Sequence, residues 1–217
     1  MDTEAVLLSL KLALWTLALI IPFGIWVAHC LLSLNKSKPW LEAGLALPLV
    51  LPPTVLGYYL LVGLGGKSLL GVPLVFSFTG ILIASLIVNL PFAIQPIQRA
   101  FEAINPDIRE AAQVSGLSKW QIFRLIELPL AWRGITSAAV LTFAHTLGEF
   151  GVVLMVGGAI PGETKTVAIS IYDKVQSFDT VGAGTLASLL LGISLVAIAL
   201  SYGVFGKSIN YSNRGRT

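Results

Sequence analysis

Five apolar stretches, each about 20 residues long or longer, set the main limit on how this chain can fold: residues 8–32, 44–64, 79–100, 134–156 and 184–206. As helices they are long enough to cross a hydrocarbon layer of roughly 30 Å. With 55% hydrophobic and 12% charged residues, the chain lies outside the range of ordinary soluble domains. The sequence therefore predicts an all-α membrane protein with one domain, residues 1–217, folded as a polytopic bundle of five transmembrane helices.

The basic residues between these stretches predict the orientation of the bundle. One set of connecting segments holds most of them: Lys36, Lys38, Arg99, Arg109, Lys119, Arg124, Arg133, Lys207, Arg214 and Arg216. The opposite set holds only Lys11, Lys67, Lys165 and Lys174. The positive-inside rule then places the N-terminus outside and the C-terminus in the cytoplasm. This topology accounts for the pI of about 9.1, so the charge does not predict a nucleic-acid partner. The first stretch is too long for a signal peptide and follows two acidic residues, Asp2 and Glu4.

A charged insert at residues 101–133 is predicted to lie in the cytoplasm and to begin with a short helix. Asn105 supplies a side-chain N-cap, Pro106 suits the first helical position, and Asp107 places a negative charge at the positive helix end. Gly116 stands where a helix ends in the left-handed conformation that glycine adopts without strain.

A second short helix is predicted after that glycine. Ser118 and Gln121, three residues apart, form a capping-box pattern. Pro129 is expected to end this helix, because proline lacks the backbone N–H that a helix interior needs.

The insert resembles the EAA loop of bacterial ABC-importer permeases. The resemblance covers Glu110, Ala111, Ala112, Gly116, Ile126, Leu128 and Pro129, in the family's spacing. It implies a type I importer permease fold in which the first short helix docks on a cytoplasmic ATPase. The chain itself would be non-catalytic and bind no cofactor, and the partner ATPase would use ATP and magnesium. Without the resemblance, the insert reads as an ordinary amphipathic loop.

Prolines interrupt the second and third stretches and suggest a transport pathway. Pro48, Pro52 and Pro53 lie in the second stretch, and Pro91 and Pro96 lie in the third. Backbone carbonyls freed by proline are tolerated at membrane depth only inside protein or beside a water-filled cavity. Pathway lining and simple helix kinks both remain open at this point. The nearby polar residues Thr54 and Asn89 are candidate pathway residues.

The fourth stretch carries a polar face formed by Thr142, His145, Thr146 and Glu149. At 1.5 Å per residue from Arg133, Glu149 would lie about 24 Å into the membrane, towards the outer surface. Ionisable residues inside a membrane suggest function, so these four residues are candidates for the gate of the pathway. A structural role is the alternative, in which Glu149 pairs with His145 or caps backbone groups nearby. Because a bare carboxylate would repel a dianion, Glu149 is expected to be paired or protonated and not to bind substrate.

Residues 157–183 are predicted to form an external loop that contains a helix at about 164–176. Ala168, Ile171, Tyr172 and Val175 would share its packed face. A solvated loop is the alternative.

Enzyme and metal chemistry find little support in the sequence. His145 could act as the base of a serine hydrolase, but Ser115 lies in the cytoplasmic insert and Ser137 lies about two helical turns away. His145 and Glu149 alone do not make a metal site, and a single cysteine, Cys30, excludes an internal disulfide.

Further segments resemble molybdate permeases and suggest the substrate. The resemblance rests on residues 47–58 (LPLVLPPTVLGY), on 147–151 (LGEFG), which sulfate permeases share, and on 160–164 (IPGET). It implies an importer in the bacterial inner membrane that contains a second copy of the chain, two ATPase subunits and an external oxyanion-binding protein. Transport would proceed by alternating access. No lysine or arginine is predicted at mid-membrane, so we expect selectivity to reside in the binding protein. Sulfate or tungstate remains an alternative substrate, and an ion-coupled carrier or a channel remains the alternative class.

Overall fold

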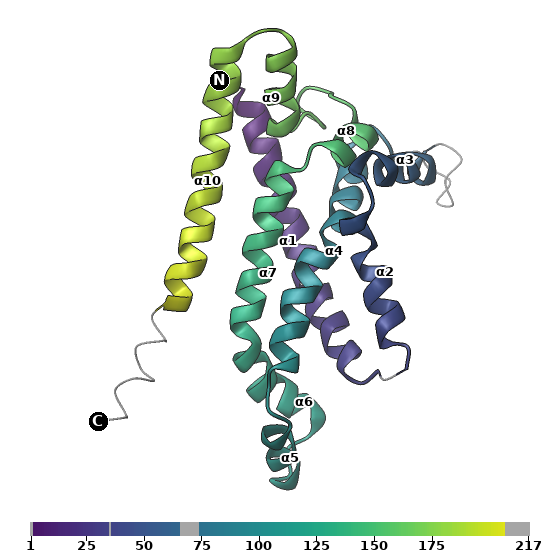
Figure 1. Cartoon of the computed structure of the whole chain (residues 1–217), viewed down its shortest axis with the longest axis vertical. Coiled ribbons are helices and arrows are strands. Elements are labelled where there is room, and N and C mark those ends of the chain that lie inside the picture. The colour runs from purple at the N-terminus through teal and green to yellow at the C-terminus, as the bar shows by residue number, and fades with distance from the viewer. Residues whose placement is uncertain (1, 35, 66–73, 207–217) are drawn as a thin grey trace.

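The computed structural model describes residues 2–34, 36–65 and 74–206, and within these ranges it contains helices and no strands (Figure 1). Three helices are each long and apolar enough to cross a membrane: α1 (Thr3–Leu32), α4 (Phe78–Glu102) and α10 (Thr180–Gly206). The predicted all-α membrane fold is confirmed. Four of the basic residues used to predict the orientation, Lys67, Lys207, Arg214 and Arg216, lie outside the described residues.

The second and fourth predicted spans are bent pairs of helices. The chain bends by 105° between α2 (Lys38–Val50) and α3 (Pro53–Leu64). It bends by 59° between the helix that ends at Gly148 and α8 (Gly151–Gly157). The count of five spans holds when each pair is taken as one span, but the expectation of continuous helices over 44–64 and 134–156 is wrong.

Local backbone chemistry explains the break between α2 and α3. Leu51 is extended (φ −71°, ψ 135°), the conformation favoured before a proline, and Pro52 and Pro53 offer no N–H to continue the helix. The second break follows Glu149, which is also extended (φ −66°, ψ 120°).

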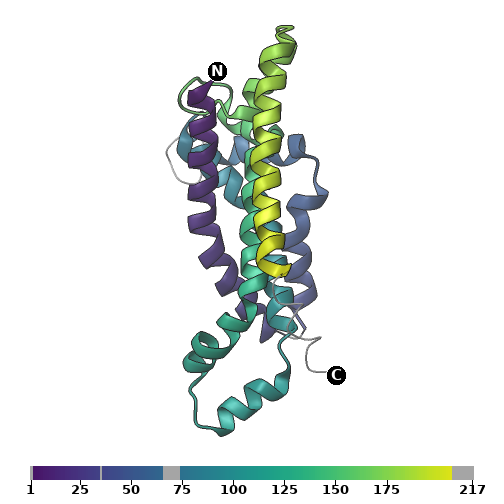
Figure 2. The ribbon, with the colours of Figure 1, turned by 90° about the vertical axis from the view of Figure 1, so that its left-hand side faces the viewer.

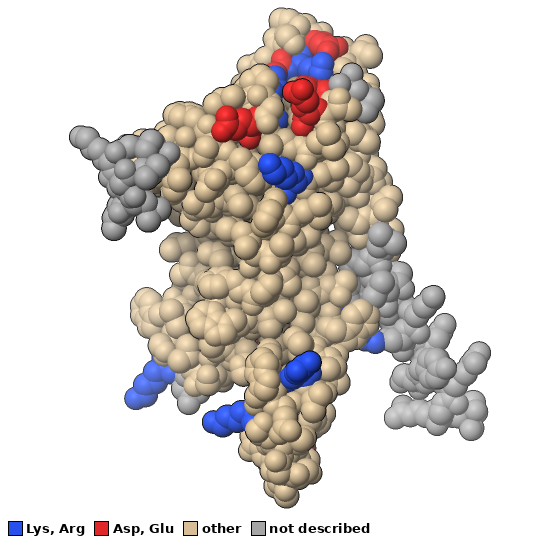
Figure 3. Space-filling model, turned by 180° about the vertical axis from the view of Figure 1, so that it is seen from behind, with Lys and Arg blue, Asp and Glu red and all other residues tan. Residues whose placement is uncertain are grey.

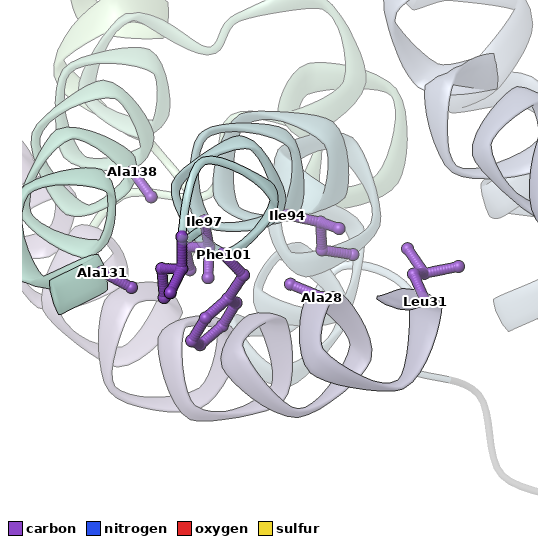
Figure 4. Close-up of a cluster of buried hydrophobic side chains, with 8 residues drawn as sticks. Ala28, Leu31, Ile94, Ile97, Phe101, Ala131 and Ala138 are labelled. Carbon is purple, nitrogen blue, oxygen red and sulfur yellow. The ribbon is translucent and has the colours of Figure 1, made fainter. Parts of the chain in front are cut away.

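The core lies where α1, α4 and α7 (Leu128–Gly148) pack against one another. Phe101 is fully buried between these helices, and the small residues Ala28, Ala131 and Ala138 let the backbones approach closely (Figure 4). This core gives three spanning helices a common packed centre near the end that carries α5.

The helix predicted at about 164–176 is present as α9 (Val167–Gln176), and of its predicted packed face Ile171 packs against buried residues of α1 and α10. Val167 and Ile169 are buried, whereas Tyr172 and Val175 are exposed. The start of α9 is held against α1, where Ser9 Oγ accepts a hydrogen bond of 2.8 Å from the Val167 amide. That bond fixes where α9 begins against α1.

Figure 3 shows how charged side chains are distributed on one face of the molecule. Acidic side chains are visible on this face only at the end that carries the N-terminus, where basic ones accompany them, and the charged side chains visible at the opposite end are basic. The end with basic side chains carries α5 (Pro106–Val114) and α6 (Lys119–Ile122), which extend below the spanning helices (Figure 2).

Candidate functional site

The first half of the insert forms the short helix that the sequence predicts. The Asn105 side chain accepts a hydrogen bond of 3.0 Å from the Asp107 amide and so caps α5. At the other end Gly116 has φ +83°, and the Leu117 amide donates to the Ala112 carbonyl at 3.1 Å. This is the left-handed helix ending expected from the glycine.

The second half of the insert forms a helix that continues into the membrane span. Ser118 and Gln121 form the predicted capping box, with reciprocal bonds of 2.8 and 3.3 Å. A π-helical segment, η1 (Phe123–Glu127), then joins α6 to α7 without interruption. The expectation that Pro129 ends the second helix is therefore wrong. The π segment shifts the hydrogen-bond pattern by one residue, with the Leu128 amide bonded to the Phe123 carbonyl directly before Pro129, so the helix continues past a residue that has no N–H to donate.

The predicted coupling residues divide between the surface and the interior of the insert. Glu110, Ala111, Gly116 and Pro129 are exposed, Ala112 is buried, and Ile126 and Leu128 are half-buried. α5 also exposes two apolar side chains that the sequence reading did not single out, Ile108 (41%) and Val114 (90%). An exposed apolar surface on a helix outside the bundle is typical of a docking surface.

A buried acidic residue next to the coupling motif was also missed. Glu127 is 5% exposed and bonds to Arg109 of α5 and to His29 of α1. The sequence signal for its burial was a single acidic residue between apolar residues, shortly before the fourth apolar stretch.

A second candidate region is a cavity of about 240 Å³ beside the break between α2 and α3. It is lined by Pro48, Leu49, Leu51, Pro53, Leu56, Val88, Phe92, His145, Glu149 and Val152. Both broken spans contribute to its wall, and the polar lining side chains are those of His145 and Glu149.

Three neighbours hold the imidazole of His145 in this wall. Its ring stacks on Phe92 at a centroid distance of 4.1 Å, and Nδ1 lies 3.2 Å from Asn89 Oδ1. Since an amide oxygen can only accept, Nδ1 is the donor. Nε2 lies 3.7 Å from Glu149 Oε2, which leaves this nitrogen directed towards the carboxylate.

Glu149 combines both arrangements considered from the sequence. Its Oε1 accepts a bond of 3.2 Å from the Val152 amide in the first turn of α8, and its Oε2 faces His145. The carboxylate therefore stabilises the start of α8 while it lines the cavity.

The other candidate pathway residues lie elsewhere. Thr54 is exposed on α3 and does not line this cavity. Thr142 and Thr146 are buried in α7, and Thr146 Oγ1 donates to the Thr142 carbonyl at 2.8 Å. Asn89 is fully buried and contributes by holding His145.

Metal coordination has no site in the part of the chain that the structure describes. No group of three or more His, Cys, Asp or Glu side chains there is arranged to hold an ion. The two regions are a helical insert at one end of the bundle and a small cavity within it.

Comparison with known proteins identifies the family. Residues 20–211 match the family described as binding-protein-dependent transport system inner membrane component. The chain belongs to this family. It is therefore a multi-pass inner-membrane subunit of a transport system and not itself an enzyme.

The chain is similar to several permeases of molybdenum and sulfate transport systems. It is 41% identical to the molybdenum transport system permease protein ModB of Azotobacter vinelandii over 93% of each chain. Against the protein of that name from Escherichia coli K12 the identity is 34%, over 92% of each. The sulfate transport system permease protein CysW of Synechococcus elongatus is 31% identical, over 91% of this chain and 72% of the relative.

The fold is also that of a solved importer. A bacterial alginate ABC transporter, solved in complex with an alginate pentasaccharide-bound periplasmic protein, has a chain that matches with a TM-score of 0.73. The identity is 17%, and the match covers 92% of this chain and 76% of that one.

Proposed function

We propose that the chain is the permease subunit of an ATP-driven importer for molybdate. The observation that carries the substrate is the similarity to molybdenum permeases along nearly the whole chain, which exceeds the similarity to sulfate permeases. Sulfate and tungstate are the competing substrates, since both are tetrahedral dianions.

Coupling to an ATPase is the first element of the mechanism. α5 extends beyond the membrane helices and exposes Glu110 together with Ile108 and Val114. We propose that this surface docks on a cytoplasmic ABC ATPase and that two such subunits bind and hydrolyse ATP with magnesium. The chain binds neither.

A second copy of the chain is the next partner. α2 has no buried residue, and Leu47, Leu49 and Val50 on it are about half exposed or more. The break at Leu51 and Pro52 also interrupts backbone hydrogen bonding, which lipid cannot replace. This face therefore needs protein or water against it. A homodimer whose α2 and α3 surround a shared pathway satisfies both requirements.

We place the gate of this pathway at the cavity wall formed by His145 and Glu149. Closure of the two ATPases would move the inserts, and this movement would open the pathway to the outside at this wall. The mechanism is alternating access. Because Glu149 is directed at His145 and at the start of α8, it is available as a gate contact and not as an anion ligand.

The topology follows from the charge distribution. We propose that residues 101–133 lie in the cytoplasm and that residues 157–183, with α9, lie outside, where an oxyanion-binding protein docks. Cysteines at position 3 and at positions 165–180 should react with an impermeant thiol reagent in intact cells, and one at 113 should be protected. Cys30 is exposed and must first be replaced. Labelling at position 113 contradicts the orientation.

Reconstitution tests the function. The chain, its ATPase and its binding protein are placed in proteoliposomes, and uptake of radiolabelled molybdate is measured with and without ATP. Uptake that requires ATP and the binding protein, and that excess sulfate fails to suppress, supports the proposal. Uptake without ATP indicates a carrier or channel, and preferential sulfate uptake refutes the substrate.

A further inference from the structure

The helix proposed to dock on the ATPase has few packing contacts with the bundle. Ala112 is the one buried residue of α5. A force applied to α5 must reach the spanning helices either through its flexible ends or through a rigid side-chain contact. Arg109 provides such a contact.

Arg109 joins α5 to two other segments. Its Nε donates to Glu127 Oε1 at 2.5 Å, and its terminal nitrogen donates to the Phe101 carbonyl at 2.8 Å. Phe101 belongs to the end of α4 and is fully buried in the core. A guanidinium held at two points in fixed geometry is a stiff connection.

Glu127 extends this connection to a third helix. Its side chain is 6% exposed, and its second oxygen lies 2.9 Å from His29 Nε2 near the end of α1. The imidazole is in turn packed edge-on against Phe123 at 4.7 Å and Phe101 at 5.9 Å. One carboxylate therefore links α1 and α5, and through Arg109 also α4, to the helix that becomes α7.

The π-helical segment sets the direction of Glu127. One additional residue in a turn rotates the preceding helix by about 100° relative to the following one. Glu127 is the last residue of η1, so it lies at this change of direction. Such segments occur frequently at functional sites.

We infer that Glu127 is a positioning residue that transmits movement of α5 to the cytoplasmic ends of α1, α4 and α7. Opposite charges in a buried setting resist separation more strongly than exposed ones, so the contact can carry force when α5 is displaced. The inference rests on the proposed function, since it assumes that an ATPase moves α5.

The test uses the reconstituted transporter, in which assembly, ATP hydrolysis and molybdate uptake are measured on one preparation. Glu127→Gln removes the charge with little change in size, and Arg109→Lys keeps the charge but removes the two-point geometry. Arg99→Gln is the matched control, because Arg99 forms an exposed 3.2 Å ion pair with Glu102 at the same end of the bundle. The double variant Arg109→Glu/Glu127→Arg tests whether the pairing itself matters.

For Glu127→Gln we expect an assembled complex that still hydrolyses ATP, with molybdate imported per ATP reduced about tenfold or more. The molybdate imported per ATP by Arg109→Lys should lie between the values for Glu127→Gln and for the Arg99→Gln control. The control should match the wild type. The double exchange should recover part of the coupling. A purely structural role would lower the amount of complex and leave uptake per ATP normal.

Two results overturn the inference. One is uptake per ATP in Glu127→Gln equal to that of Arg99→Gln. If the Glu127→Gln complex does not assemble, the Arg109→Lys variant decides instead. An assembled Arg109→Lys complex with normal uptake per ATP then overturns the inference. A wild-type complex that imports no molybdate refutes the proposed function instead, so the two failures are distinguishable.

Discussion

Replacing Gly134 with alanine is expected to force α4 and α7 apart. Gly134 lies in α7 at its crossing with α4. A Cβ atom built there would lie 2.4 Å from Ala100 Cβ and 2.6 Å from the Pro96 carbonyl oxygen. Carbon atoms in van der Waals contact lie about 3.5–4.0 Å apart, so the first contact is short by more than about 1 Å.

The size of the effect follows from two opposing terms. Overpacking costs about 1–3 kcal/mol, and the upper part of this range applies because neither a Cβ methyl nor a backbone carbonyl can rotate away. Exchanging glycine for alanine in a helix gains about 0.5–1 kcal/mol. The net loss is about 1–2 kcal/mol, and at about 2–4 °C per kcal/mol for a chain of this size the melting temperature should fall by about 2–8 °C.

Thermal unfolding of the detergent-purified subunit, followed by fluorescence-detected size exclusion, measures this shift. Gly44→Ala is the matched control, since no neighbouring atom lies within 4 Å of a Cβ at Gly44 in α2. Adding Ala100→Gly to Gly134→Ala should recover only part of the loss, because the Pro96 carbonyl remains at 2.6 Å. If the melting temperature of Gly134→Ala equals that of Gly44→Ala, the expected clash between α4 and α7 is refuted.

Three further predictions concern the coupling turn, the cavity wall and the external surface. At Gly116, φ is +83° and a Cβ meets no atom within 4 Å, so Gly116→Val suffers backbone strain alone, of order 1–3 kcal/mol. It should lose ATPase association and uptake while remaining in the membrane, whereas Gly116→Asn should keep both; normal uptake in the valine variant contradicts this. Glu149→Gln retains an oxygen for the Val152 amide, so assembly should be unchanged while uptake per ATP changes; less complex with normal transport per complex indicates a structural role only. On the surface, the hydrogen bond from Lys174 lowers the pKa of Asp179. A lowered carboxyl pKa stabilises the fold above the usual aspartate range and loses that contribution as pH falls through the folded-state value. The melting temperature of Asp179→Asn should therefore decrease less on acidification than that of the wild type, and equal decreases would argue against the pairing.

Features governed by neighbouring residues could be predicted from the sequence. The length of the apolar stretches determined how many times the chain can cross a membrane. Asn105, Gly116 and Ser118 predicted the caps and the turn of the insert correctly, because each acts on backbone groups within a few residues. The order of residues in the EAA loop was sufficient to indicate the family.

Features that depend on packing between distant segments were decided by the tertiary structure. Glu127 meets His29 across 98 residues of sequence, and no local pattern specifies that contact. Helical periodicity put Thr142 and His145 on one polar face, but the packing of neighbouring helices buried Thr142 and left His145 at the cavity. Pro129 likewise remained inside a continuous helix, because η1 altered the hydrogen bonding before it. A side chain's spacing along a helix fixes its direction from the axis, whereas the helices packed around it determine what that direction meets.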